Sequence, residues 1–180
     1  LEDKMNSGEL ARYLDIQDPD DVLAVVSFFI TNPDAMLQLR KRWALRDASH
    51  GRVIGDFASV QPPNPSDFGG SIALVNPFRL EEGFITEMDI HLAFGLCVDR
   101  QDKSIYVASG GVIRQIKGGR CVRLLNNNLF NDLHTLALTH SGNLLVASTG
   151  TDSILEIDFQ IGEVYWDWLA TEHGYGLSPS

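Results

Sequence analysis

Short apolar runs alternate with turn residues over residues 130–168. The runs cover residues 136–139, 144–148, 154–158 and 164–168, and the segments between them are rich in Gly, Asn, Asp and Ser. Runs of this length with β-branched and aromatic residues, bounded by turn residues, predict β-strands. The connections are too short for crossover helices, so we expect the four strands to form one antiparallel sheet.

Helical periodicity is confined to residues 1–50. An Asp-Pro pair at residues 18–19 is a helix-start signal, and Val22, Val25, Val26 and Phe29 follow with the spacing of one helix face. An Asn-Pro pair at residues 32–33 repeats the signal and predicts a second helix that ends near Arg46. A shorter helical piece is expected over residues 8–14. The pattern predicts an N-terminal helical hairpin, followed at residues 51–70 by a Pro-rich linker with a possible strand over residues 53–58.

From residue 71 onward the sequence repeats with a period of about forty residues. Three segments, beginning at residues 71, 111 and 153, each show a strand, a tight turn and a second strand; the first strands end at Asn76, Ile116 and Ile157, one repeat period after another. The two later copies share a preceding hairpin that ends in Val-Ala-Ser, at residues 107–109 and 146–148. One four-stranded sheet per repeat of this length is the size of a propeller blade. We therefore predict a mainly β protein, with a partial β-propeller over residues 71–180: part of a blade at 71–90 and full blades at 91–131 and 132–176.

Two of these runs resemble known propeller families. The run LCVDRQDKSIYVA over residues 96–108 is similar to repeats of the NHL/SMP-30 type, and SILEIDFQIGEVYWDW over residues 153–168 is similar to repeats of arylsulfotransferase-like propellers. The resemblance covers about residues 71–176 and implies the blade. Proteins with such blades include binding scaffolds, lactonases, lyases and sulfotransferases.

About half of a propeller ring is expected in this chain, because such relatives close rings of about six blades. Half a ring leaves sheet edges and apolar faces uncovered. Three arrangements would cover them: the chain is a fragment of a longer protein, copies of it associate to complete a ring, or the helical hairpin covers an open face. The sequence favours the fragment, with self-association next.

Charge and composition restrict the partners. The formal net charge is -10 and the sequence pI is about 4.8, so nucleic acid and anionic membranes are not expected as partners. No run is long and apolar enough to span a bilayer, which favours a soluble protein. The sequence leaves the compartment open, with the cytoplasm favoured. The two cysteines, Cys97 and Cys121, fall in apolar runs and are expected to be buried thiols without a disulfide framework.

An acid and a histidine occur together after each predicted outermost strand. The histidines are His91, His134 and His173, and the neighbouring acids are Asp89, Asp132 and Glu172. In a propeller these points lie near the central channel, where converging imidazoles with carboxylates beside them could hold a divalent metal, Zn or Ca. Some propeller lyases hold zinc in this way, so the resemblance supports the hypothesis. Alternatively, the histidines fill polar channel positions with water, or bind an anionic group such as sulfate or carboxylate.

Two aromatic residues, Trp166 and Trp168, share one face of the last predicted strand. They could stack on a sugar, as in a lectin, although packing between blades is the favoured interpretation. The function predicted from the sequence is a binding or scaffolding module for a protein or small molecule, with a polar, histidine-containing channel face. The alternative is a metal-dependent propeller enzyme of the lyase, hydrolase or sulfotransferase kind that uses the channel histidines.

Overall fold

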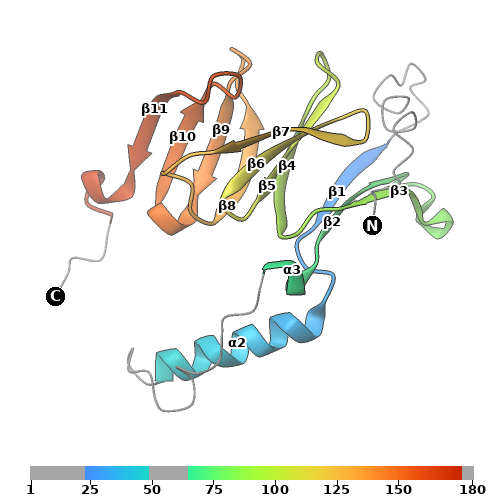
Figure 1. Ribbon diagram of the computed structural model, residues 1–180, viewed down its shortest axis with the longest axis horizontal. Coiled ribbons are helices and arrows are strands. Elements are labelled where there is room, and N and C mark those ends of the chain that lie inside the picture. Colours follow the sequence, from blue (N-terminus) through green and yellow to red (C-terminus); the bar gives the residue numbers. More distant parts are fainter. Residues whose placement is uncertain (1–22, 49–64, 176–180) are drawn as a thin grey trace.

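The computed structural model describes residues 23–48 and 65–175, and in this part the chain forms three antiparallel sheets and several helices (Figure 1). The first sheet contains β1 (Ala24–Phe28), β2 (Ser71–Val75) and β3 (Phe84–Asp89). The second contains β4 (Ala93–Asp99), β5 (Ser104–Ser109), β6 (Val112–Lys117) and β7 (Arg120–Asn126). The third contains β8 (Leu133–Leu138), β9 (Leu144–Ser148), β10 (Ser153–Ile157) and β11 (Val164–Leu169). The helices are α2 (Pro33–Ala48), α3 (Pro65–Phe68), η2 (Leu80–Glu82), η3 (Thr149–Thr151) and η4 (Ala170–His173).

The second and third sheets are meanders, in which each strand pairs with the next one along the chain. Their turns contain residues that stabilise tight bends. The side chain of Asp99, for example, accepts hydrogen bonds from the backbone N–H groups of Gln101 and Asp102 at 2.9 and 3.1 Å. Both sheets agree with the four-stranded antiparallel units that the repeat predicts.

The second sheet lies between the other two, and both faces of its strand β5 are buried. Ile105 and Val107 on β5 pack in a cluster with the first sheet, and the alternate residues Tyr106 and Ala108 pack in a second cluster with the third sheet. Figure 1 shows the sheets side by side, with the third at the left and the first at the right. Meanders that pack face to face in this way form a β-propeller-like fold.

The repeat is visible in the backbone as well as in the sequence. Leu92 and Asp132, one repeat period apart, precede the first strands of the second and third sheets, and both have a φ of 54°. The serines that end the two Val-Ala-Ser segments also act alike: Ser109 Oγ donates to the carbonyl of His91 at 2.6 Å, and Ser148 Oγ donates to that of Asn131 at 3.0 Å. These bonds attach each incoming connection to its sheet, which explains why the repeat has serine there.

The predicted helical hairpin is only half correct. The second helix is confirmed, since α2 begins at Pro33 and the side chain of Asn32 accepts a hydrogen bond from the Ala35 N–H at 3.3 Å. The first helix is wrong, because residues 24–28 form strand β1, which pairs with β2 along its whole length. This segment is apolar except for Ser27, so its helix-like spacing did not distinguish a helix from a strand. The pieces expected at residues 8–14 and 53–58 lie outside the described residues.

The first sheet therefore takes a strand from the segment expected to be helical. Strands β1, β2 and β3 correspond to the last three strands of the second sheet, and within residues 23–48 and 65–175 no counterpart of β4 or β8 accompanies them. The connection between β1 and β2 covers residues 29–70 and includes α2 and α3, whereas Gly110 and Gly111 alone join β5 to β6. Among the described helices, none has the length and apolar character needed to cross a membrane.

Candidate functional site

The inner strands β4 and β8 carry the same irregularity near their starts. In β4, Ala93 pairs with Ser109, but the next pair is Leu96 with Val107, so β4 has one extra residue. In β8 an extra residue likewise separates Leu133 from Thr135 in the pairing with β9. Bulges of this kind change the direction of side chains at sheet edges and near binding sites. They place Phe94 and His134 at equivalent positions of successive repeats.

Gly95 in β4 allows these two strands to approach closely. A Cβ atom added at this residue would lie 2.1 Å from the carbonyl oxygen of His134 and 3.0 Å from the Cα of Thr135. Only glycine leaves room for the β8 backbone at this point. The close approach of the strands brings the bulged side chains of Phe94 and His134 together.

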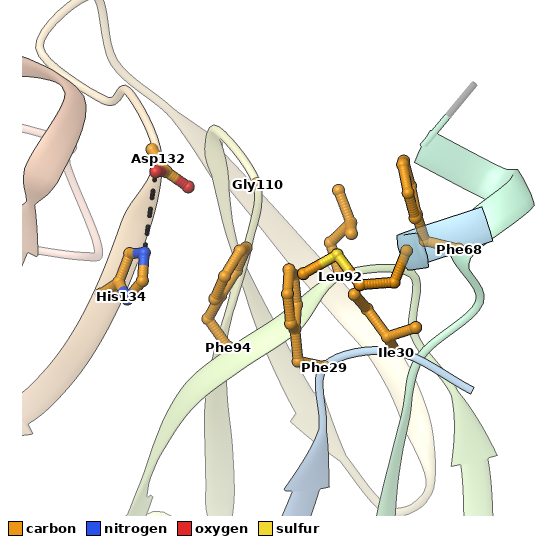
Figure 2. Close-up of a pocket in the computed structure, with 9 residues that line it drawn as sticks. Phe29, Ile30, Phe68, Leu92, Phe94, Gly110, Asp132 and His134 are labelled. Atoms are coloured by element: carbon orange, nitrogen blue, oxygen red, sulfur yellow. Dashed lines mark ion pairs between the residues drawn. The ribbon is translucent and has the colours of Figure 1, made fainter. Parts of the chain in front are cut away.

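Three rings form a row beside the inner strands (Figure 2). The ring centroids of Phe29, which follows β1, and Phe94 are 3.9 Å apart, and those of Phe94 and His134 are 4.6 Å apart. The β1 and β4 segments are also joined by a hydrogen bond from Ser27 Oγ to the Phe94 carbonyl at 2.9 Å. Two rings come from the second and third sheets, and Phe29 follows the first strand of the first sheet, so the row connects all three.

A cavity of about 370 Å³ lies beside this row of rings. This volume is within the range of small-molecule sites. The cavity is lined mainly by apolar side chains from the β1–β2 connection and from the starts of the inner strands. Its lining residues are Phe29, Ile30, Met36, Phe68, Leu92, Phe94, Gly110, Asp132 and His134.

The polar side chains of the cavity lie at one end. The Nε2 atom of His134 is 3.6 Å from the Oδ2 atom of Asp132, and both side chains are about half exposed. Thr149 Oγ1 donates to the backbone carbonyl of Asp132 at 2.8 Å and lies 3.3 Å from its carboxylate. Because the pair is exposed to solvent, it contributes less than about 1 kcal/mol to stability. Its importance is the position of a carboxylate at the rim of an apolar cavity.

The three histidines predicted to converge have different surroundings, since His134 lines the cavity and His173 does not. Leu92 and Asp132 occupy equivalent positions of the repeat, so the counterpart of His134 is Phe94. By the same alignment the counterpart of His91 is Asn131. The interval between His91 and His134 therefore does not match the repeat. His173 is in η4, where its ring stacks on Trp168 with centroids 5.1 Å apart. Across residues 23–48 and 65–175, no group of three or more His, Cys, Asp or Glu side chains is placed to hold a metal ion.

The neighbouring acids are also dispersed. Asp89 ends β3 and Glu172 lies in η4, both exposed, and only Asp132 lines the cavity with its partner histidine. The structure therefore brings together one of the three predicted acid–histidine pairs with the cavity. The metal site stays a prediction.

The predicted aromatic pair lies on the outermost strand of the third sheet. Trp168 pairs with Ile154, and Trp166 pairs with Glu156, on the face turned away from the second sheet. Trp166 is 48% exposed, and the ring of Trp168 packs on those of His173 and Tyr175. The expected packing between blades is absent from this face among the described residues. Stacking on a sugar stays a prediction.

The two cysteines differ in environment. Cys97 in β4 is half-buried, and this burial, followed by the charge of Asp99, raises the pKa of its thiol to about 12. Cys121 is exposed in β7, so the expectation of a buried thiol is wrong there. β7 is the outermost strand of its sheet, which leaves one side of it open to solvent.

Sequence reasoning did not find the apolar part of the site. Phe29, Phe94 and Leu92 are not among the predicted site residues, which are the acids, the histidines and the tryptophan pair of the last strand. The available signal was the interval between Phe94 and His134, which equals the repeat period. Rings that recur one repeat period apart are therefore the feature of the sequence that indicates this site.

Comparisons with known proteins give partial structural similarities. No protein-family model matches the sequence, and no curated protein matches it. A crystal structure of a protein of unknown function from Bacteroides caccae has 11% sequence identity and a TM-score of 0.46, covering 57% of this chain and 39% of its own. A structure of a nidogen/laminin complex has 12% identity and a TM-score of 0.45, covering 58% of this chain and 40% of its own. The chain thus spans about two fifths of the length of each structure. Its propeller-like fold is assigned from its own sheets.

Proposed function

We propose that this chain is a propeller-like binding module that takes a small, mainly apolar ligand in the cavity beside Phe29 and Phe94. The observation that carries the proposal is the cavity of about 370 Å³ bordered by the row of rings. Apolar cavities of this size with a few polar groups at one end are typical of ligand sites. Asp132 and His134 support the proposal, because they give the rim of the cavity a polar end.

The cavity is a property of the whole arrangement of elements. Met36 comes from α2, Phe68 from α3, and Phe94 from the bulge of β4, so three separate elements form its walls. A ligand that contacts all three elements would stabilise the packing of the β1–β2 connection against the inner strands. Binding is therefore expected to stabilise the folded chain by mass action.

Binding of indole tests the proposal. Indole has nine non-hydrogen atoms, and at about 0.4 kcal/mol per atom it would bind with a dissociation constant on the order of 1 mM. We expect ligand-observed NMR to detect this binding and Phe94→Leu to weaken it at least about fivefold. Met36→Trp, which fills the cavity without removing a wall, should weaken it as well. The matched control is Phe78→Ala, because Phe78 is 76% exposed in the turn before η2 and lies outside the cavity.

Two results would show that the proposal is wrong. The first is no detectable indole binding at concentrations well above the expected dissociation constant. The second is equal weakening by Phe94→Leu and Phe78→Ala, which would place the binding elsewhere. Membership of the NHL/SMP-30 or arylsulfotransferase-like families, and the metal-dependent enzyme activity that the histidines suggested, stay predictions.

A further inference from the structure

The cavity has a charged end and an apolar end. Figure 2 shows Asp132 and His134 at one side, Phe94 and Phe29 in the middle, and Phe68 at the opposite side. A ligand that follows this arrangement has an apolar body and one polar end group. The sign of the charge at the polar end decides which group is favoured.

The polar end favours a cation. Asp132 is the acidic residue of the lining, and none of the described lining residues is Lys or Arg. This end therefore carries a carboxylate without a lysine or arginine beside it in the lining, and the whole chain has a formal net charge of -10. An anionic ligand would meet a carboxylate without a compensating lysine or arginine, which costs binding free energy.

The carboxylate of Asp132 has room for another donor. A carboxylate can accept about four hydrogen bonds. The contacts to Asp132 Oδ2 are the hydroxyl of Thr149 at 3.3 Å and Nε2 of His134 at 3.6 Å, both longer than an optimal bond. The backbone of Asp132 is fixed by its left-handed conformation and by the hydrogen bond from Thr149 to its carbonyl. An ammonium group could therefore bind a carboxylate that is already positioned.

We infer that the ligand of this cavity is a small organic cation, an amine with an apolar body, whose ammonium group binds Asp132. The inference rests on the proposed function, and it adds the chemical class of the ligand. The ammonium donates to the carboxylate at the rim, and the apolar body lies between Phe29, Leu92 and the α3 side of the cavity.

Three indoles with different charges test the inference at one pH and salt concentration. Tryptamine carries an ammonium group, 3-methylindole is neutral, and indole-3-propionate carries a carboxylate. We expect tryptamine to bind about three- to fivefold more tightly than 3-methylindole, as suits a half-exposed charge pair, and indole-3-propionate to bind most weakly. Asp132→Asn should abolish the preference for tryptamine over 3-methylindole.

The matched control is Asp152→Asn. Asp152 is exposed, also has a positive φ, of 47°, and lies outside the cavity lining. Asparagine tolerates the left-handed conformation at both positions, so the two variants change the net charge equally with little backbone strain. Asp152→Asn should keep the preference, which separates a contact with Asp132 from general attraction to an acidic protein.

The outcomes separate the two claims. Equal affinity for tryptamine and 3-methylindole, or an equal loss of preference in both variants, would overturn the inference and leave the proposed function standing. Absence of binding by all three indoles would overturn the proposed function together with the inference.

Discussion

The contact between β4 and β8 gives the most demanding test of this structure. Gly95→Ala adds one methyl group at a point where its carbon would lie 2.1 Å from the His134 carbonyl oxygen and 3.0 Å from the Thr135 Cα. Both atoms belong to the β8 backbone, so no side-chain rotation relieves the overlap. The strands must therefore move apart, which disturbs the packing between the second and third sheets. Overpacking of a rigid site costs roughly 1–3 kcal/mol, and we expect the upper part of this range.

Urea unfolding, followed by circular dichroism, measures this cost. The matched control is Gly111→Ala, since a Cβ at Gly111 would meet the Phe130 carbonyl oxygen at 3.6 Å, an ordinary contact. Neither glycine has a positive φ, so the two substitutions differ in local crowding. We expect Gly111→Ala to change the free energy of unfolding by less than about 1 kcal/mol. If Gly95→Ala is as stable as Gly111→Ala, the close approach of β4 and β8 is wrong, and the row of rings that depends on it is wrong too.

Three further predictions concern other parts of the molecule. A thiol reagent should modify Cys121 rapidly in the folded protein and the half-buried Cys97 only on unfolding. Mass spectrometry of the labelled protein measures this difference, and rapid labelling of both thiols would contradict the burial of Cys97. Hydrogen bonds from Lys117, and then from Ser104, lower the pKa of Asp102 below its ordinary value of 3.8. A lowered pKa in the folded state contributes stability that is present above the unfolded-state pKa and is lost as the pH falls through the folded-state pKa. Asp102→Asn should therefore reduce the loss of stability on the acid side by less than about 1 kcal/mol. Urea unfolding between pH 5 and pH 2 measures this change. Ile113→Lys should unfold the protein and Ile154→Lys should not, because the two residues occupy equivalent positions of the repeat but their side chains are 0% and 37% exposed. Circular dichroism measures the folded fraction of each variant. A similar loss of folded protein in both variants would contradict the burial of one strand face and the exposure of the other.

The strands of the second and third sheets could be predicted because their ends are marked locally. Each strand ends at glycine, asparagine or aspartate within a few residues, and these residues determine the turn without help from the rest of the fold. Helix α2 was predictable for the same reason, since Asn32 caps its first turn. Local signals of this kind are present in the sequence itself.

Strand β1 and the cavity depend on contacts between distant segments. Residues 24–28 form a strand because β2, far along the chain, pairs with them, and nothing in the segment itself excluded a helix. The partners of Phe94 depend on a bulge of a single extra residue and on a glycine that is needed only because β8 passes beside it. Reasoning from titratable residues found the acid–histidine pair at the rim and missed the apolar walls.

The cavity occurs where the first sheet departs from the repeat. In the second sheet the turn that follows β5 is short, and its Gly110 only borders the cavity, whereas the corresponding connection after β1 is long and supplies Ile30, Met36 and Phe68 to its walls. The bulge residue is aromatic in both later sheets, but it is Phe94 in one and His134 in the other, which gives the row of rings an apolar part and a polar end. Packing of repeated sheets requires neither the long connection after β1 nor the change from phenylalanine to histidine at the bulge. Both differences meet at the same cavity, and this coincidence is the reason to look for ligand binding there rather than at the histidine spacing.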